Sequence, residues 1–375
     1  MTNDRAVVLV GCGYAADFYV ACLTSYPHLK LVGAYDIDQE RATTFCGFHG
    51  ITRFGSLTEA LDQDAIVANL TTIESHHEVT KAALLRGRHV FSEKPLALAQ
   101  AETDELRHLA ETRGLLLASA PSTSLGPCYG AVREALHGGL IGRPLVVHAN
   151  LEDGAVHRMD YRNWISPSGQ PWPARHEFAA GPILEHAGYQ LTWLVRLFGG
   201  VKQMTGMTTT VEPAPRPKEA TDWRFGPNLA LWSLTHDSGV VTRLSAGGVA
   251  PRDYSMRIFG EEGVLEVEDV MRLNSPVAYR RSASVTEHSR IGYLGPTERL
   301  RYDTPPPPYD DTHYIDFAAG LAEMADCLDG PGAPRLGLPL SAHVLELTLE
   351  LITSGARTVR PTTRYGEPRE TRTPR

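Results

Sequence analysis

Two short segments of the sequence carry side chains that can move protons or stabilise charge. Lys94 precedes a proline, which restricts its backbone to an extended conformation just after a short strand expected at residues 89–91. The second segment holds Glu185, His186 and Tyr189, and the four-residue spacing of Glu185 and Tyr189 places both on one face of a helix. The ammonium group of Lys94 can bind a substrate hydroxyl and stabilise its oxygen as a hydride leaves. The pattern therefore predicts redox chemistry between an alcohol and a ketone.

The group that would accept the hydroxyl proton has three candidates. The phenol of Tyr189 ordinarily has a pKa near 10, so it would need the Lys94 ammonium beside it at neutral pH. The imidazole of His186 titrates closer to neutrality, although His186 lies about 100° around the helix from Glu185. The carboxylate of Glu185 is the third candidate, and the sequence leaves the choice open.

A glycine-rich turn near the N-terminus has the form G-x-G-x-x-A between an apolar run and a helical pattern. It consists of Gly11, Cys12, Gly13, Tyr14, Ala15 and Ala16. The first glycine makes the turn, the second lets a pyrophosphate approach the backbone, and the small Ala16 lets the helix pack closely. The N-terminus of the helix then offers amide donors to phosphate oxygens. The turn predicts a dinucleotide site.

Asp36 follows the next apolar run and indicates which dinucleotide binds. A carboxylate at this position can accept both ribose hydroxyls of an adenosine, and it would repel a 2′-phosphate. The next residue, Ile37, offers no guanidinium group to such a phosphate. We therefore predict NAD rather than NADP as the cofactor.

The elements around these residues predict two domains. Apolar runs alternate with helical patterns over residues 1–121, as in a Rossmann domain with a parallel sheet. Over residues 122–360 two helices, at about 127–138 and 183–198, precede successive strand-like segments, which predicts an α+β domain with a largely antiparallel open sheet. Residues 361–375, rich in Pro, Thr and Arg, are expected to form a flexible tail or an arm over a neighbouring subunit.

Several segments resemble the Gfo/Idh/MocA oxidoreductases. Residues 87–97 resemble the family stretch GKHV-x-x-EKP-L, and residues 71–78 resemble its TPN-x-x-H-x-E turn. Residues 141–144 and 257–265 resemble the entry to the family's second domain and its G-x-x-G-x-L hairpin. The resemblance spans about residues 5–355. It implies an NAD-dependent dehydrogenase acting on a hydroxyl or ketone of a sugar, cyclitol or related metabolite, with the second sheet mediating a homodimer or homotetramer.

The resemblance also implies roles for individual residues. Lys94 would be catalytic and contact both substrate and cofactor, and further cofactor contacts would come from Thr71, Thr72, His76 and Glu93. The family's helix usually reads D-x-G-x-H, whereas Glu185 and Tyr189 stand at the two positions here, as substrate-binding and acid/base candidates. Residues 120–124 depart from the family's G-x-N-x-R-F, which indicates a substrate unlike that of the best-known members.

A polar, aromatic loop before the helix supplies further substrate-binding candidates. They are Arg162, Trp164 and His176, because aromatic faces and a guanidinium group suit a sugar ring and its hydroxyls. His76 and His77 are adjacent and point apart, and no third ligand is near in sequence, so no metal site is predicted.

Composition restricts the partners. The 375 residues carry a formal net charge of −8 with Lys and Arg scattered, which argues against nucleic acid or an anionic membrane as partner. No apolar run approaches the roughly 20 residues of a membrane span. The five cysteines form no CxxC pair and no signal peptide is recognisable, so we expect a cytoplasmic protein.

Two other functions fit the same features. The enzyme could oxidise and re-reduce its substrate with retained NAD, giving epimerisation or elimination-type glycoside cleavage. Alternatively, the chain could be a catalytically silent NAD-binding sensor, although a sensor would not need the ammonium group of Lys94.

Overall fold

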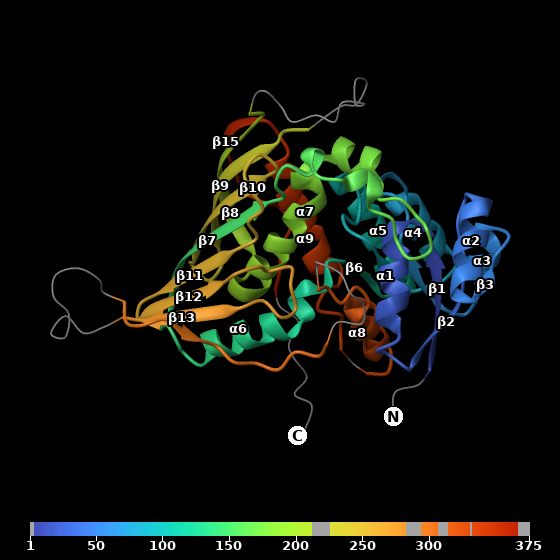
Figure 1. Cartoon of the computed structure of the whole chain (residues 1–375), viewed down its shortest axis with the longest axis horizontal. Helices are drawn as coiled ribbons and strands as arrows, with labels where there is room; N and C mark the ends of the chain where they lie inside the picture. Colours follow the sequence, from blue (N-terminus) through green and yellow to red (C-terminus); the bar gives the residue numbers. More distant parts are fainter. Residues whose placement is uncertain (1–3, 212–225, 283–293, 307–313, 331, 367–375) are drawn as a thin grey trace.

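The computed structural model describes residues 4–211, 226–282, 294–306, 314–330 and 332–366. Figure 1 shows two layered units side by side, with the helices α7 and α9 lying between their sheets. This arrangement places the helix that carries Glu185 beside the first domain.

The first unit is built on a sheet whose strand order is β3-β2-β1-β4-β5-β6 in the described residues, with every neighbouring pair parallel. The strands are β1 (Arg5–Val10), β2 (Leu29–Tyr35), β3 (Thr52–Arg53), β4 (Ile66–Asn69), β5 (Val90–Ser92) and β6 (Leu117–Ser119). The helices are α1 (Tyr14–Leu23), α2 (Gln39–His49), α3 (Leu57–Asp62), α4 (His76–Leu85) and α5 (Gln100–Arg113), with the short η1 (Ile73–Ser75) after β4. This topology confirms the predicted Rossmann fold.

The direction of strand succession reverses between β1 and β4, which are neighbours in this sheet. Loops leaving the carboxyl ends of two such strands diverge to opposite faces, and the crevice between them is where open α/β sheets bind ligands. The glycine-rich turn follows β1, and Thr71 and Thr72 follow β4. The fold therefore brings both predicted cofactor segments to one crevice.

The second unit contains a sheet of order β14-β13-β12-β11-β7-β10-β9-β8-β15 in the described residues. In this order the strands are β14 (Glu298–Arg299), β13 (Val277–Arg281), β12 (Gly263–Val267), β11 (Met256–Gly260), β7 (Pro144–Glu152), β10 (Val241–Gly247), β9 (Leu229–His236), β8 (Val201–Thr209) and β15 (Gly355–Val359). Among the described strands of this sheet, only β7 and β10 pair in parallel, and β7 precedes in the chain the meander that supplies β10. The prediction of a largely antiparallel sheet is confirmed.

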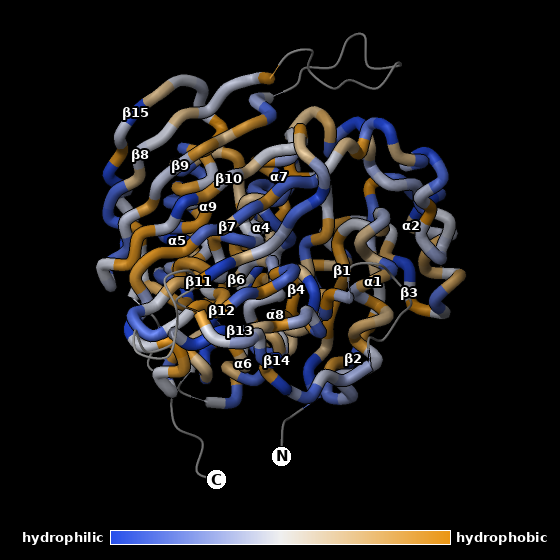
Figure 2. Tube along the Cα trace, turned by 60° about the vertical axis from the view of Figure 1, so that its left-hand side comes forward, coloured by the Kyte–Doolittle hydropathy of each residue, from blue (hydrophilic) through white to orange (hydrophobic). Residues whose placement is uncertain are grey.

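One face of this sheet is covered and the other is open. Helix α7 (Ala174–Phe198) packs against β7, β9 and β10, and α9 (Leu338–Leu351) packs beside α7. Hydrophobic and hydrophilic residues alternate along these strands (Figure 2), as a half-buried sheet requires. On the open face the apolar side chains of Val146, Leu231 and Val241 remain exposed.

Helix α7 is two helical segments joined at a kink. Gly181 has φ +80°, which favours glycine, and Pro182 follows it as the first residue of the second segment. The sequence predicted only the second segment, beginning at residue 183. The first helical segment, residues 174–180, was not predicted, because its apolar residues do not continue the buried stripe of the second segment.

The C-terminal part of the chain contacts both units. Helices α8 (Ala319–Cys327) and α9 pack against β6, and the Ser119 amide donates to the Leu336 carbonyl at 3.2 Å. α6 (Pro127–His137) links the two units. In the segment assigned to the tail, residues 361–366 contact the second unit, because Thr362 and Thr363 donate to the Glu346 carboxylate on α9. Residues 367–375 lie outside the described residues.

Candidate active site

The glycine-rich turn has the geometry that a pyrophosphate requires. Gly11 has φ +103°, and a Cβ there would lie 2.5 Å from the Leu70 carbonyl oxygen, so only glycine fits. A Cβ on Gly13 would meet nothing within 4 Å, which means that open space lies beside this backbone. Gly13, the N-cap of α1, has no side chain that could cap the helix, so the positive end of the helix dipole faces this turn and favours phosphate oxygens. These residues fit a dinucleotide.

Asp36 is 5% exposed and is held by the backbone on both sides. Its Oδ2 accepts from the Cys12 amide at 2.8 Å, and its Oδ1 accepts from the Asp38 amide at 2.8 Å. Arg41, one turn into α2, places a guanidinium nitrogen 3.4 Å from the same Oδ1. From the sequence only Ile37 was weighed against a 2′-phosphate, and the Arg41 cation, which the helix brings back to the ribose side of the site, was missed.

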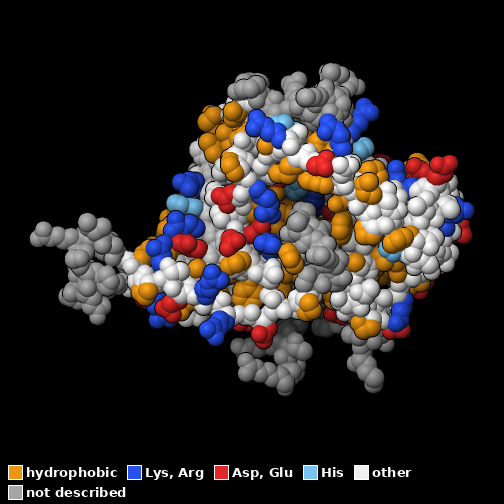
Figure 3. Space-filling model, in the orientation of Figure 1, with side chains coloured by type: hydrophobic (Ala, Val, Ile, Leu, Met, Phe, Trp, Pro, Cys, Tyr) orange, Lys and Arg blue, Asp and Glu red, His pale blue; other side chains and the backbone are white. Residues whose placement is uncertain are grey.

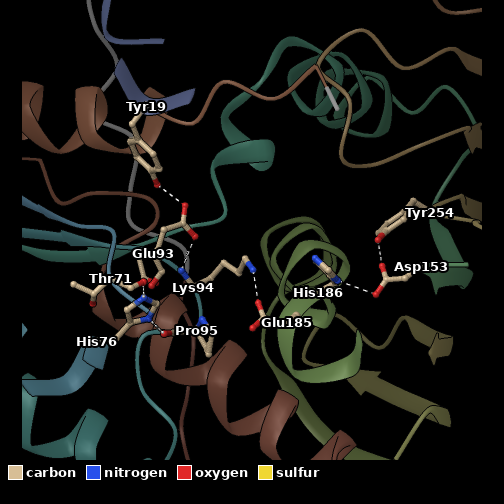
Figure 4. A network of polar contacts seen from close by, with 11 residues as sticks. Tyr19, Thr71, His76, Glu93, Lys94, Pro95, Asp153, Glu185, His186 and Tyr254 are labelled. Carbon is tan, nitrogen blue, oxygen red and sulfur yellow. Dashed lines mark hydrogen bonds and ion pairs between the residues drawn. The ribbon is translucent and has the colours of Figure 1, made fainter. Parts of the chain in front are cut away.

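The turn that carries Lys94 is held in place by the half-buried Glu93 and the buried His76. Glu93 accepts from the Tyr19 hydroxyl on α1 at 2.7 Å and from the Lys94 amide at 2.9 Å. The buried ring of His76 places Nδ1 2.7 Å from the Pro95 carbonyl oxygen and Nε2 3.0 Å from the Thr71 carbonyl oxygen (Figure 4). Both side chains were predicted to contact the cofactor, and in the structure they hold the backbone of the Lys94 turn. Thr71 itself donates through its hydroxyl to Asn69 at 2.7 Å.

Lys94 joins the two units through an ion pair. Its Nζ lies 2.8 Å from Oε2 of Glu185 on α7, and both side chains are largely buried. Burial disfavours the ammonium form, but Glu185 and the other acidic groups around it together outweigh burial and raise the pKa of Lys94 well above its usual value. Lys94 therefore carries its charge at neutral pH and is oriented by Glu185 (Figure 4).

A cavity of about 670 Å³ opens on the other side of Glu185. The side chains that could bind a substrate there include Asp153, His157, Trp172, Glu177, Phe178, Glu185, His186 and Asn228. Two aromatic rings and several carboxylates, with an amide, can pack against and hydrogen-bond a polyhydroxylated ring. Most of these residues were not found from the sequence, because β7, the loop at 172 and residue 228 are remote from one another along the chain.

His186 belongs to a chain of hydrogen bonds behind this cavity. Its Nδ1 lies 2.8 Å from Oδ2 of Asp153, and the Tyr254 hydroxyl donates to the other oxygen of that carboxylate (Figure 4). Burial opposes the charged imidazole, but Asp153 outweighs it and raises the pKa of His186 above its usual value. The 100° rotation from Glu185 thus turns His186 toward Asp153 while both residues still border the cavity.

Tyr189 packs beside this group rather than in the cavity wall. Its ring stacks on the His186 ring with centroids 6.0 Å apart. Burial raises the pKa of the Tyr189 phenol, and the neighbouring Lys94 ammonium lowers it by less than burial raises it. The structure brings together Lys94, Glu185, His186 and Tyr189. The sequence predicted that Lys94 would activate Tyr189, but burial of the phenol outweighs the effect of Lys94 on its pKa.

Glu177 was not foreseen as a site residue. It lies in the first segment of α7 and borders the same cavity as Glu185 and His186. Burial and the Glu185 carboxylate raise the pKa of Glu177 to about 7. This carboxyl group changes charge near neutral pH.

The three loop residues predicted for substrate binding lie in or beside a segment that crosses to the first domain. We call residues 164–176 the strap; it reaches toward α1 in Figure 1. The Arg162 guanidinium lies over the Tyr161 ring at 4.7 Å, and the Trp164 ring contacts the Trp172 ring at 5.2 Å. His176 pairs with Glu74 of η1 at 3.0 Å. Of the strap's aromatic rings, that of Trp172 borders the cavity.

The strap is anchored to a buried carboxylate. Asp17, on the first turn of α1, accepts from the hydroxyls of Ser166 and Ser168, the latter at 2.7 Å. Nε2 of His49 lies 2.6 Å from its other oxygen. Together with the His176–Glu74 pair, these contacts attach the strap to the elements that follow β1 and β4, on both sides of the crevice.

Two other kinds of feature are absent from the described part of the chain, namely a metal-binding cluster and a membrane-spanning helix. No group of three or more His, Cys, Asp or Glu side chains there is arranged to hold a metal ion. None of the described helices combines the length and apolar character needed to cross a membrane. Basic and acidic side chains are interspersed on the face shown in Figure 3, without a continuous basic surface on that face.

Comparison with known proteins agrees with this architecture. Residues 5–120 match the family model of an oxidoreductase family with an NAD-binding Rossmann fold, and residues 129–266 match the GFO/IDH/MocA C-terminal domain. An uncharacterised oxidoreductase of Synechocystis sp. is 27% identical over 70% of this chain and 71% of its own length. The trans-1,2-dihydrobenzene-1,2-diol dehydrogenase of Oryctolagus cuniculus is 29% identical over 52% of this chain and 57% of its own. The dTDP-3,4-didehydro-2,6-dideoxy-alpha-D-glucose 3-reductase of Streptomyces antibioticus is 33% identical over 37% of this chain and 43% of its own length.

Solved structures share the whole fold at low identity. An oxidoreductase from Agrobacterium radiobacter in complex with NAD+, L-tartaric acid and magnesium has a TM-score of 0.74 at 18% identity, over 96% of this chain and 98% of its own. A 3-ketoreductase from Actinomadura kijaniata in complex with TDP-benzene and NADP has a TM-score of 0.69 at 19% identity, over 94% of this chain and 98% of its own. These likenesses concern the fold, whereas the two family models together match most of the sequence. The chain belongs to the GFO/IDH/MocA family of oxidoreductases.

Proposed function

We propose that this protein transfers a hydride between NAD and a secondary hydroxyl or ketone of a sugar, cyclitol or sugar-containing metabolite. The observation that carries the proposal is the Lys94–Glu185 ion pair, which lies between the dinucleotide crevice and the cavity. The names of relatives such as the 1,5-anhydro-D-fructose reductase of Ensifer adhaerens and the Streptomyces antibioticus reductase support a carbohydrate-like substrate.

The residues at the junction of crevice and cavity have complementary tasks. A bound nicotinamide supplies the hydride acceptor or donor. The Lys94 ammonium donates a hydrogen bond to the reacting oxygen and stabilises the negative charge that develops there. Glu185 keeps that ammonium charged and aimed, and the Glu93 carboxylate fixes the backbone amide of Lys94. Trp172 and Phe178 offer apolar surface to the ring, and Asn228 offers an amide to its hydroxyls.

NAD is the proposed cofactor because the Asp36 carboxylate is buried and held in place by two backbone amides. Such a carboxylate favours a free 2′-hydroxyl over a phosphate. Arg41 argues in the other direction, since its guanidinium group could partly offset the repulsion of a phosphate. Binding of NADH and NADPH, each followed by its fluorescence, measures the preference directly.

The test of the function is a screen of sugars, inositols and nucleotide sugars with NAD or NADH, followed through the absorbance of the reduced nicotinamide. We expect turnover with at least one class of polyol or keto sugar. Absence of net turnover, together with NAD carried through purification, would instead favour the second candidate.

That second candidate is a reaction that retains NAD and oxidises the substrate only transiently. The strap supports it, because Ser166, Ser168 and His176 attach the strap on both sides of the crevice. Chromatography of the products would detect epimerisation or glycoside elimination, even though the absorbance of the nicotinamide shows no net change in such a cycle.

We also propose that a second copy of the chain covers the open face of the second sheet. The exposed Val146, Leu231 and Val241 support this, since an apolar sheet face in water favours association. Light scattering of the purified protein would give the mass of the assembly, and Leu231→Arg would be expected to lower it.

A further inference from the structure

The hydrogen-bond chain behind the cavity leaves one imidazole nitrogen available for chemistry. Asp153 follows β7, and Tyr254 precedes β11, so neighbouring parts of the second sheet hold the two residues together. Asp153 and Tyr254 are both buried, and His186 is the member of the chain that is partly exposed. Because Nδ1 of His186 faces a carboxylate oxygen at 2.8 Å, Nδ1 carries the proton in the neutral ring. Nε2 is then the basic nitrogen, on a residue that borders the cavity.

We infer that His186 is the acid/base catalyst of the proposed reaction, with Asp153 and Tyr254 as its positioning residues. The inference rests on the proposed function and names the group that moves the proton. In oxidation, the substrate C–H bond breaks toward the nicotinamide as a hydride, while the O–H proton passes to Nε2 of His186. The products are a ketone, the reduced cofactor and an imidazolium. Asp153 stays ionised and stabilises that imidazolium, and reduction reverses each step.

The charges around His186 agree with this role. Asp153, Glu177 and Glu185 border the cavity together with His186, and Lys94 of the first domain pairs with Glu185. Burial and Lys94 oppose the imidazolium, whereas Asp153 and Glu177 favour it, and the pKa of His186 rises overall. A base whose pKa is raised is a stronger proton acceptor than a free imidazole.

Tyr189 is the alternative that the family pattern favours, and its surroundings differ. The phenol is buried, its pKa is raised, and it does not border the cavity. Its ring stacks on His186 and limits how that ring can turn. These contacts make Tyr189 a support of His186 that keeps its own proton.

The first experiment compares His186→Gln with Tyr189→Phe, using steady-state oxidation of the best substrate from the screen. We expect His186→Gln to lower kcat roughly 10²–10⁴-fold, the usual contribution of a general base. Tyr189→Phe should lower it less than about tenfold. His108→Gln, on the exposed side of α5, controls for the substitution itself. NADH fluorescence verifies that each variant still binds cofactor.

The second experiment tests the positioning role through the pH profile of kcat/KM. Asp153→Asn removes the carboxylate that raises the pKa of His186, so the inflection should move to lower pH while activity falls. Tyr254→Phe should shift the same inflection by a smaller amount. Added imidazole should restore part of the activity of His186→Ala and none of that of Lys94→Ala.

The outcomes separate the two levels of the proposal. Absence of any turnover by the wild-type protein would contradict the proposed function itself. Wild-type turnover that survives His186→Gln, or that Tyr189→Phe abolishes, would overturn only the assignment of His186. An inflection that stays in place in Asp153→Asn would remove Asp153 from the mechanism.

Discussion

The dinucleotide crevice and the substrate cavity are assembled in different ways. In the crevice each group lies at the carboxyl end of a parallel strand, so Gly13, Asp36, Thr71 and Lys94 meet because the strands are neighbours. In the cavity, Asp153, Trp172 and Asn228 come from a strand end, the strap and the start of another strand. The crevice thus depends on local backbone geometry, and the cavity depends on how distant segments pack. Substitutions should therefore have separable effects in the two regions.

The largest effect is expected at Lys94, where the two regions meet. Lys94→Met removes the ammonium that stabilises the reacting oxygen, and kcat should fall about 10²–10³-fold with NADH affinity little changed. The single change leaves the buried Glu185 without its ion-pair partner. The double variant Lys94→Met/Glu185→Gln therefore checks that the fall in kcat is not caused by loss of folding. The exposed Lys30→Ala is the control. Activity in Lys94→Met close to that of Lys30→Ala would contradict the proposed chemistry.

The next effect concerns the crevice alone. Asp36→Ala removes the acceptor of the ribose hydroxyls, so the Kd for NADH should rise roughly 10–100-fold, as for loss of a hydrogen bond to a charged group. NADPH binding should improve, since the repelling carboxylate is gone and Arg41 remains. Asp36→Ala/Arg41→Ala should lose that improvement. Titration by nicotinamide fluorescence measures both constants, and an unchanged NADH Kd would argue that Asp36 is only a structural carboxylate.

The same contrast explains how much could be predicted from the sequence. The Rossmann topology, the glycine-rich turn and the position of Lys94 follow from short contiguous patterns, and they were predicted. Arg41 was missed although it lies five residues after Asp36, because a helical turn rather than the strand brings it back. Asp153 and Tyr254 carry no local signal, since their roles arise only when α7 packs on the second sheet. His76 and Glu93 stand at the expected positions but bond to the protein backbone.

A smaller effect should follow from loosening the strap, which joins the two regions. Asp17→Asn keeps the size of the side chain but weakens its bonds to Ser166, Ser168 and His49. If these bonds must break before the cofactor leaves, NADH release should be about tenfold faster, as expected for about 1.4 kcal/mol. Stopped-flow energy transfer from the strap's Trp164 and Trp172 to NADH measures the rate. Asp104→Asn, on an exposed helix, is the control, and equal release rates in both variants would mean that the strap does not limit exchange.

The smallest effect is a pH-dependent stability that should belong to the cavity. The pKa of Glu177 is raised to about 7 in the folded protein, so between its ordinary value and 7 the folded state holds a proton that the unfolded state has lost. The contribution of Glu177 to the free energy of unfolding is therefore lost as the pH rises from the ordinary pKa of a glutamate to about 7. Below that range the contribution does not change with pH. Glu177→Gln removes the buried charge, so at pH 8 it should unfold at a higher temperature than the wild type, by roughly 1 kcal/mol after allowance for the partial exposure of the group. At about pH 4 the unfolding temperatures of Glu177→Gln and of the wild type should be nearly equal. Scanning calorimetry at both pH values, with the exposed Glu111→Gln as control, decides the matter: a gain that is the same at both would show that burial of charge at Glu177 is not its cause.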